Sequence, residues 1–379
     1  MEHYIFFERF SEYCHADYEA CREQGKKIAG IYCVYAPLEL IRAAGAIPVG
    51  LCGKKEAPIP VAEEVLPQNL CPLIKSSYGY ARSDTCPFFA VSDFIIGETT
   101  CDGKKKMYEF LNRIKPVYLM HLPYTQNNSQ ALTFWEEEIK RLAEHLEKIT
   151  DQKIHDHEVM RQIGLHDRLR EEIWAVTRLI ADPRTPLGSL EMMTILETKS
   201  FAVNLVSYID HLTALRRELA EYQNLPLPDK TPLRVLLTGC PVGRGSEKVI
   251  RIIEELGASV VCMENCTGMK NLFASPVRHQ DPLKILAERY LAIPCSCMTP
   301  NQGRLDSIRQ LAGEFSIHAV IDLTWLFCHT YNVESKVIEE YVSQKLNFPC
   351  LHIVTDYSSS DCEQLRTRIE AFLEMIQTG

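Results

Sequence analysis

The chain has 379 residues, 46% hydrophobic and 24% charged, which is the composition of a globular protein of about two to three domains. Its net charge of −9, from 41 Lys and Arg against 50 Asp and Glu, argues against a protein that wraps nucleic acid or coats an anionic membrane. It has no run of 18 apolar residues and no signal-peptide pattern, so we expect a cytoplasmic protein that spans no membrane.

Residues 1–128 alternate between helix and strand signals. In chain order, the sequence predicts a helix over 37–44, strands over 46–52 and 88–97, a helix over 103–113 and a strand over 117–122. Strands that alternate with helices indicate βαβ units and a mainly parallel sheet. We therefore predict an N-terminal α/β domain over 1–128.

Residues 129–223 are charged and helical, and the run EEEIKRLAEHLEKI is the clearest amphipathic helix. This stretch predicts an inserted helical layer and not a further sheet. Residues 224–232, NLPLPDKTP, contain three prolines and no hydrophobic period, which is typical of a linker.

The alternation returns over 233–379. The predicted strands are 235–237, 259–263, 319–323 and 350–354, and the predicted helices are 246–256, 281–291, 305–313, 334–346 and 362–376. We predict a C-terminal α/β domain here, so that two parallel-sheet domains flank the helical insertion. The sequence shows no short repeat, but the two α/β regions are candidates for structural duplicates.

Cysteine is the unusual residue, with 15 in a chain that is too long to need disulfides for folding. In a reducing compartment, clustered cysteines are more often metal or cofactor ligands than crosslinks. Free cysteine also packs as a small hydrophobe. We therefore expect about half of the cysteines to be packing residues.

Four cysteines follow predicted strands. Cys101, Cys240 and Cys266 each lie where a strand ends, and Cys328 does the same. Ligands of open α/β sheets bind outside the carboxyl ends of the strands. Cys101 also precedes Asp102, the expected N-cap of the next helix, and a helix N-terminus stabilises a thiolate. These four cysteines are therefore candidate ligands.

The remaining cysteines fall into two sets. Cys33 and Cys71 precede predicted helices and are further candidates. Cys295 and Cys297 lie in a loop flanked by prolines and are candidates too, while Cys86 lies in another loop and fits either set. The others lie on one helical face, within strands or at helix starts, where packing is the better interpretation: Cys14, Cys21, Cys52, Cys262, Cys350 and Cys362.

The spacing of the candidates favours an iron–sulfur cluster over structural zinc. Zinc sites use compact pairs with two to four residues between the cysteines, and Cys262 and Cys266 have such a gap but lack a second pair. Cys101 and Cys328 are far apart in the chain, so a site that contains both is assembled by the fold. Thiolates from several strand ends suit a cluster, although spacing alone leaves zinc open.

Polar residues near the cysteines have competing interpretations. The segment 239–248, GCPVGRGSEK, lacks the order of a phosphate loop, so any ATP dependence would come from a partner. The lysines of 104–106 could contact a phosphate, but a solvated helix start is the more frequent case. Glu39 is a candidate acid or base facing the cleft. His329 is a candidate hydrogen-bond donor to a cluster or a substrate.

Eight segments, in order along nearly the whole chain, carry a family resemblance: GIYCVYAPLELIRAAGAIPV, NLCPLIKSSYG, GETTCDGKKKMYEFL, LLTGCPVGRGSEKVIRIIEELGA, ENCTG, PCSCMTPNQGRL, CHTYNVESKVI and VTDYSSSDCEQLRTRIEAFLEM. They resemble the 2-hydroxyacyl-CoA dehydratase and benzoyl-CoA reductase family. The extra cysteines make the chain most similar to the double-cubane cluster proteins of that family.

The resemblance implies two flavodoxin-like domains around a cleft that holds an iron–sulfur cluster. It also implies a partner, an ATP-hydrolysing activator protein with its own [4Fe–4S] cluster, which supplies electrons. Cys71, Cys101 and Cys328 match the ligands of a single [4Fe–4S] cluster in ordinary members. A double cubane, [8Fe–9S], needs a second set of three thiolates. We expect that set to come from Cys33, Cys240, Cys266, Cys295 and Cys297, with Cys86 in reserve.

The function that the resemblance implies is that of a low-potential reductase of small molecules. We expect it to be a homodimer with a double cubane. The alternative is a 2-hydroxyacyl-CoA dehydratase subunit with a single [4Fe–4S] cluster, and a non-catalytic thiol or zinc protein is a third class. Because the chain has thiols enough for two cubanes, we expect the reductase.

Overall fold

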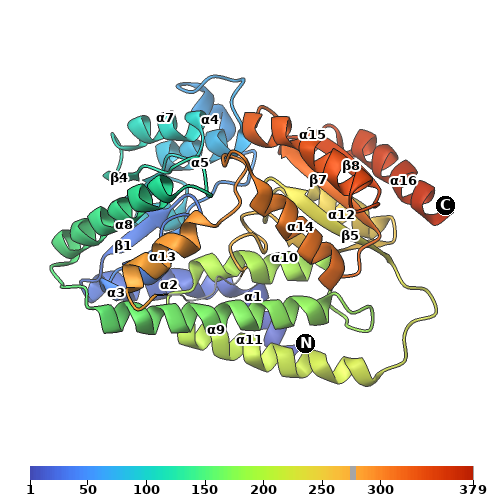
Figure 1. The fold of residues 1–379 in the computed structure, drawn as a ribbon, viewed down its shortest axis with the longest axis horizontal. Helices are drawn as coiled ribbons and strands as arrows, with labels where there is room; N and C mark the ends of the chain where they lie inside the picture. The colour runs from blue at the N-terminus through green and yellow to red at the C-terminus, as the bar shows by residue number, and fades with distance from the viewer. Residues whose placement is uncertain (274–278, 379) are drawn as a thin grey trace.

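The computed structural model describes residues 1–273 and 279–378. The first of its two sheets lies in the N-terminal third of the chain (Figure 1). Its four strands are β1 (Ile28–Ile31), β2 (Ile47–Gly50), β3 (Phe94–Glu98) and β4 (Val117–Met120). They are all parallel and follow the order β2-β1-β3-β4.

The second sheet repeats this arrangement in the C-terminal part. Its strands are β5 (Leu233–Gly239), β6 (Ala258–Glu264), β7 (Ala319–Trp325) and β8 (Cys350–Thr355). They are also parallel, in the order β6-β5-β7-β8. Each sheet therefore has the flavodoxin-like order without its fifth strand. The prediction of an α/β fold with two parallel sheets is confirmed.

Helices surround both sheets. The N-terminal part contains α1 (Glu2–Glu8), α2 (Phe10–Glu23), α3 (Leu38–Ala43), α4 (Ile59–Glu63), α5 (Pro72–Ser83), α6 (Pro87–Val91) and α7 (Asp102–Leu111). The middle contains α8 (Ser129–Thr150), α9 (Asp156–Ile180), α10 (Ser189–Thr198) and α11 (Leu205–Ala220), with short turns η1 (Lys199–Phe201) and η2 (Glu221–Asn224). The C-terminal part contains α12 (Lys248–Glu255), α13 (Pro282–Leu291), α14 (Gln302–Glu314), α15 (His329–Gln344) and α16 (Cys362–Thr378).

Two details differ from the sequence-based prediction. The apolar run 88–97 is not one strand, because Pro87 begins the short helix α6 and the Cys86 thiol caps it by accepting from Phe89 N–H at 3.4 Å. Only the last part of the run enters β3. The strand β1 has only four residues, too few to give a periodic signal, and the sequence did not predict it.

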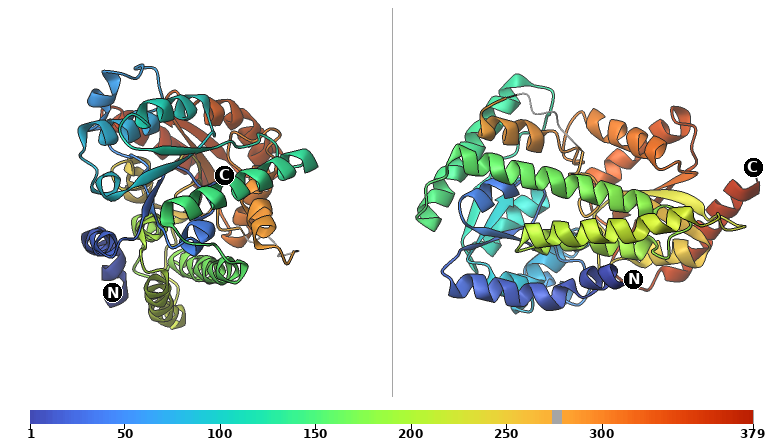
Figure 2. Two further views of the ribbon diagram at one scale, coloured as in Figure 1. Left: turned by 90° about the vertical axis from the view of Figure 1, so that its left-hand side faces the viewer. Right: turned by 90° about the horizontal axis from the view of Figure 1, so that it is seen from below.

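The helical layer joins the two sheets into one body. Helices α9 and α11 pack side by side and run below both sheets (Figures 1 and 2). A single apolar core contains Ile95 from the first sheet, Leu212 from α11 and Leu236 from the second sheet. Helix α13 comes from the C-terminal part but packs against α8 and α9. The segment that follows α13 is thereby held near the first sheet.

Among the residues that the structure describes, no helix is both long and apolar enough to cross a membrane.

Candidate functional site

A cavity of about 410 Å³ is lined by the segments that follow β1, β3, β5 and β7. In each sheet the chain reverses its winding direction between two of these strands, and such switch points are where open α/β sheets bind ligands. Cys33 follows β1 and Cys101 follows β3, while Cys240 follows β5 and Cys328 follows β7. Both switch points therefore place thiols on one cavity.

All eight cysteines predicted as candidates line this cavity: Cys33, Cys71, Cys101, Cys240, Cys266, Cys295, Cys297 and Cys328. Cys52 lines it as well, which makes nine thiols. The reserve candidate, Cys86, is absent from the cavity wall and caps α6 instead. The structure thus gathers residues from positions 33 to 328 around one space.

Three of these cysteines occupy the N-cap positions of helices. Cys71 caps α5, Cys101 caps α7 and Cys328 caps α15. The prediction that Asp102 caps its helix is wrong, because Asp102 is already the first residue of α7. The positive end of a helix dipole favours the thiolate form of a nearby thiol. Other effects outweigh it at two of these positions, because the bond to Cys328 and burial raise the pKa of Cys71, and burial raises the pKa of Cys101.

Cys328 is the centre of one group of thiols. The thiols of Cys240 and Cys71 hydrogen-bond to its sulfur, and these bonds lower the pKa of Cys328 well below its usual value. Trp325 N–H donates to the Cys240 sulfur at 3.3 Å. Gly239 precedes Cys240 and has a φ of 110°. A Cβ at position 239 would lie 2.1 Å from the Leu323 carbonyl oxygen of β7, so only glycine fits there.

Cys295 is the centre of a second group. A hydrogen bond from the Cys297 thiol lowers the pKa of Cys295 to about 6, although burial opposes this change. Cys33 and Cys266 both interact electrostatically with Cys295. Cys101 interacts electrostatically with Cys328 and with Cys295, so it connects the two groups.

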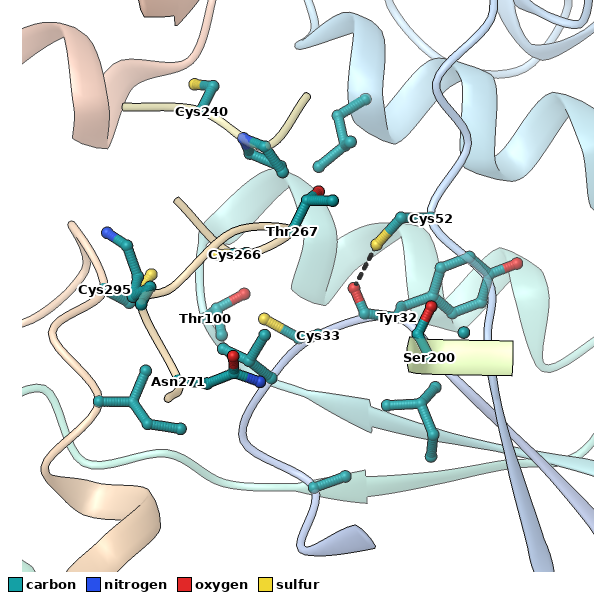
Figure 3. Close-up of a pocket in the computed structure, with 18 of the residues that line it drawn as sticks. Tyr32, Cys33, Cys52, Thr100, Ser200, Cys240, Cys266, Thr267, Asn271 and Cys295 are labelled. Carbon is teal, nitrogen blue, oxygen red and sulfur yellow. Dashed lines mark hydrogen bonds between the residues drawn. The ribbon is translucent and has the colours of Figure 1, made fainter. Parts of the chain in front are cut away.

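Cys52 was predicted to lie in a strand as a packing residue, and its placement in a strand is wrong. The strand β2 ends at Gly50, so Cys52 lies in the loop beyond it and faces the cavity. Its thiol donates to the Tyr32 carbonyl oxygen at 3.0 Å, the dashed bond in Figure 3. Figure 3 also shows Cys33 close to this pair, with Cys240, Cys266 and Cys295 around the same space.

The cavity wall is rich in buried cations. Four of them pair with carboxylates: Lys54 with Glu197 at 2.6 Å, Lys270 with Glu264 at 2.9 Å, Arg170 with Asp167 at 2.9 Å and Arg289 with Asp167 at 3.0 Å. Lys104 and Lys199 hydrogen-bond only to carbonyl oxygens among the described residues. Burial lowers the pKa of Lys199 to about 7, whereas at Lys104 the effect of burial is outweighed by Cys33 and other neighbours, which raise the pKa above its usual value. Because a buried cation is costly without a counter-charge, Lys104 favours an anionic occupant.

The two polar candidates occupy different places. His329 is exposed and lines the cavity next to Cys328. Glu39 is fully buried and is not among the residues that line the cavity. Its carboxylate accepts from Tyr290 O–H at 2.6 Å and pairs with Arg170 and Arg289, each at 3.5 Å. Glu39 thereby holds three side chains of the cavity wall in place.

Replacing Glu39 with glutamine should destabilise the protein by about 3 kcal/mol at pH 7. Burial alone would raise the pKa of Glu39, but His166, Arg170, Tyr290 and Arg289 together lower it from 4.5 to about 2. The carboxylate therefore contributes stability above its unfolded-state pKa, and this contribution is lost as the pH falls from about 4.5 to 2.

Urea denaturation of the wild type and Glu39→Gln at pH 7 and pH 3.5 measures this effect. The difference in the free energy of unfolding should shrink at the lower pH. A difference that stays constant with pH would show that Glu39 contributes through its shape and not through its charge.

The chemistry of the cavity wall suits an iron–sulfur cluster. Nine thiols surround the cavity, three of them lie at helix N-termini, and buried cations lie nearby. Iron–sulfur clusters use thiolate ligands and are tuned by dipoles and charge. In the described part of the chain, no three or more His, Cys, Asp or Glu side chains are arranged to hold one metal ion.

Comparisons with known proteins agree over nearly the full length. A family model described as 2-hydroxyglutaryl-CoA dehydratase, D-component, matches residues 33–376. A protein of Escherichia coli K12 named as a dehydratase subunit, YjiM, is 41% identical over 359 residues, 94% of this chain and 93% of that protein.

More distant relatives are similar along the same length. The beta subunit of (R)-phenyllactyl-CoA dehydratase from Clostridium sporogenes is 25% identical, with 93% of each chain covered. Subunit beta of (R)-2-hydroxyglutaryl-CoA dehydratase from Acidaminococcus fermentans is 21% identical, with 94% of each chain covered.

Proposed function

The chain belongs to the 2-hydroxyglutaryl-CoA dehydratase D-component family, and from this membership we propose that it is an iron–sulfur enzyme carrying an [8Fe–9S] double cubane. We propose that it acts as a low-potential reductase of small molecules and works as a homodimer. Its electrons would come from an ATP-hydrolysing activator protein that carries a [4Fe–4S] cluster.

The observation that carries this proposal is the number of thiols on one cavity. A single [4Fe–4S] cluster with an open iron needs three thiolates from the protein, and a double cubane needs six. The nine cavity thiols exceed the first number and suffice for the second. The group around Cys328, the group around Cys295 and the connecting Cys101 support two adjacent cubanes.

The protein's own residues would have three tasks. The thiolates bind the cluster, which when bound supplies electrons at low potential to a small substrate. The capped helices α5, α7 and α15 direct their N-termini at the thiolates and stabilise negative charge. His329 is the proposed hydrogen-bond donor to a substrate or to a sulfur atom, because it is exposed at the cavity.

A second candidate function is that of a 2-hydroxyacyl-CoA dehydratase subunit with one [4Fe–4S] cluster. The names of the relatives favour it. An anaerobic assay with activator, ATP, dithionite and a panel of 2-hydroxyacyl-CoA esters tests it. Loss of water from any ester would support the dehydratase, and no turnover of any ester would argue against it.

Metal analysis of anaerobically purified protein separates the proposals. We expect about eight iron atoms per chain, with acid-labile sulfide in similar amount. About four iron atoms would indicate the single cluster of the second candidate. Bound zinc without absorbance in the visible region would overturn both and indicate a zinc protein.

A further inference from the structure

Lys104 connects the two cysteines at the switch point of the first sheet. It lies in the first turn of α7, but its side chain is buried and turns back to the cavity. Its ammonium group donates to the Tyr32 carbonyl oxygen at 2.7 Å, in the residue directly before Cys33. Burial raises the pKa of the Cys101 thiol, and the positive charge of Lys104 opposes this change.

The Tyr32 carbonyl therefore has two donors, the Lys104 ammonium and the Cys52 thiol. Tyr32 is the first residue after β1, and the chain turns toward the cavity there. Two donors on one carbonyl fix the orientation of the peptide that leads into Cys33. A substitution of Lys104 would consequently change the position of Cys33 and the electrostatic environment of Cys101.

The charge of Lys104 lacks a carboxylate partner within 4 Å in the described part of the chain, whereas Lys105 pairs with Asp102 and Lys106 with Glu109 on the same helix. Glu98 interacts with Lys104 electrostatically; its Oε1 accepts from Ala36 N–H, and its buried Oε2 has no hydrogen-bond partner among the described residues. Burial raises the pKa of Glu98 to about 7, so this carboxyl supplies only part of a charge near neutral pH. A buried ammonium without an ion pair is costly. Its counter-charge is thus expected in the cavity itself, from the thiolates.

We propose that Lys104 is a positioning residue of the cluster site, which holds the Tyr32–Cys33 turn and places one positive charge beside Cys33 and Cys101. The inference rests on the proposed cluster. Reduction adds negative charge to a cluster, and a nearby buried cation stabilises the reduced form. Lys104 therefore raises the reduction potential of the cluster, and removing its charge lowers that potential.

Three substitutions separate the charge from the hydrogen bond. Lys104→Arg keeps the charge and a donor, Lys104→Gln keeps a donor alone, and Lys104→Met keeps neither. Lys106→Met is the matched control, since it removes an exposed lysine from the same helix. Iron and sulfide contents are measured first, on anaerobic protein. Reduction potentials are then measured by titration with dithionite, followed by visible absorbance and electron paramagnetic resonance.

We expect Lys104→Gln and Lys104→Met to have more negative potentials than the wild type, and Lys104→Arg and Lys106→Met to stay close to it. Wild-type potentials in Lys104→Gln and Lys104→Met, or a potential in Lys104→Arg as low as in Lys104→Met, would overturn the proposal.

Iron content also gives a result for variants that fail to assemble the cluster. If Lys104→Gln and Lys104→Met both lose their iron, retention by Lys104→Arg supports a charged anchor, and loss from Lys104→Arg overturns it. A wild-type protein without iron would instead contradict the proposed function, so the two failures are distinguishable.

Discussion

Replacing Cys101 with serine should remove at least half of the bound iron and leave the protein folded. Cys101 lines the cavity, caps α7 and connects the two groups of thiols around Cys328 and Cys295. Serine is a good N-cap, so α7 should retain its start. A hydroxyl is a poor replacement for a thiolate ligand, so the loss should fall on the cluster.

Cys86→Ser is the matched control, because Cys86 also caps a helix but does not line the cavity. Both variants place a serine, which is a good N-cap, at the N-cap position of a helix, so they should have similar circular dichroism and thermal midpoints. Iron analysis and the visible spectrum then compare them. Full iron in Cys101→Ser, or an equal loss in Cys86→Ser, would contradict the assignment of ligands to the cavity wall.

The positions of the candidate thiols relative to the fold could be predicted because the fold is built from parallel strands. Apolar runs ending at Cys240 and Cys328 mark strands, and carboxyl ends of parallel strands lie at one edge of a sheet. Cysteines that directly follow such strands are therefore expected to lie close together in space. Whether these neighbours bind a cluster stays a prediction that the iron analysis tests.

The roles of Cys52, Lys104 and Glu39 could not be predicted, because they depend on exact element ends or on contacts between residues that are distant in the sequence. Cys52 follows β2 by two residues, and a strand predicted slightly too long removed it from the candidates. Lys104 resembles its exposed neighbours in sequence, but its long side chain reaches the Tyr32 carbonyl across the fold. Glu39 lies on α3, and the helical pattern could not show that Arg170 and Arg289, from distant elements, cover it.

A second large effect is expected at Arg304, which is the centre of a buried network. Its guanidinium group is completely buried and bonds to Glu264 at 3.1 Å, to Asp322 at 3.3 Å and to Glu334. Lys270, which lines the cavity, completes the network by pairing with Glu264 at 2.9 Å. The network joins the end of β6 and the middle of β7 to α14 and α15.

Replacing Arg304 with methionine should lower the free energy of unfolding by about 3–5 kcal/mol, because it leaves buried carboxylates without their main counter-charge. The control is Arg309→Met on the same helix, whose exposed pair with Asp306 contributes at most about 1 kcal/mol. Urea denaturation followed by circular dichroism measures both. A loss below about 1 kcal/mol in Arg304→Met would show that solvent or a proton compensates the charge of the carboxylates. The fold next to Lys270 would then not depend on this ion network.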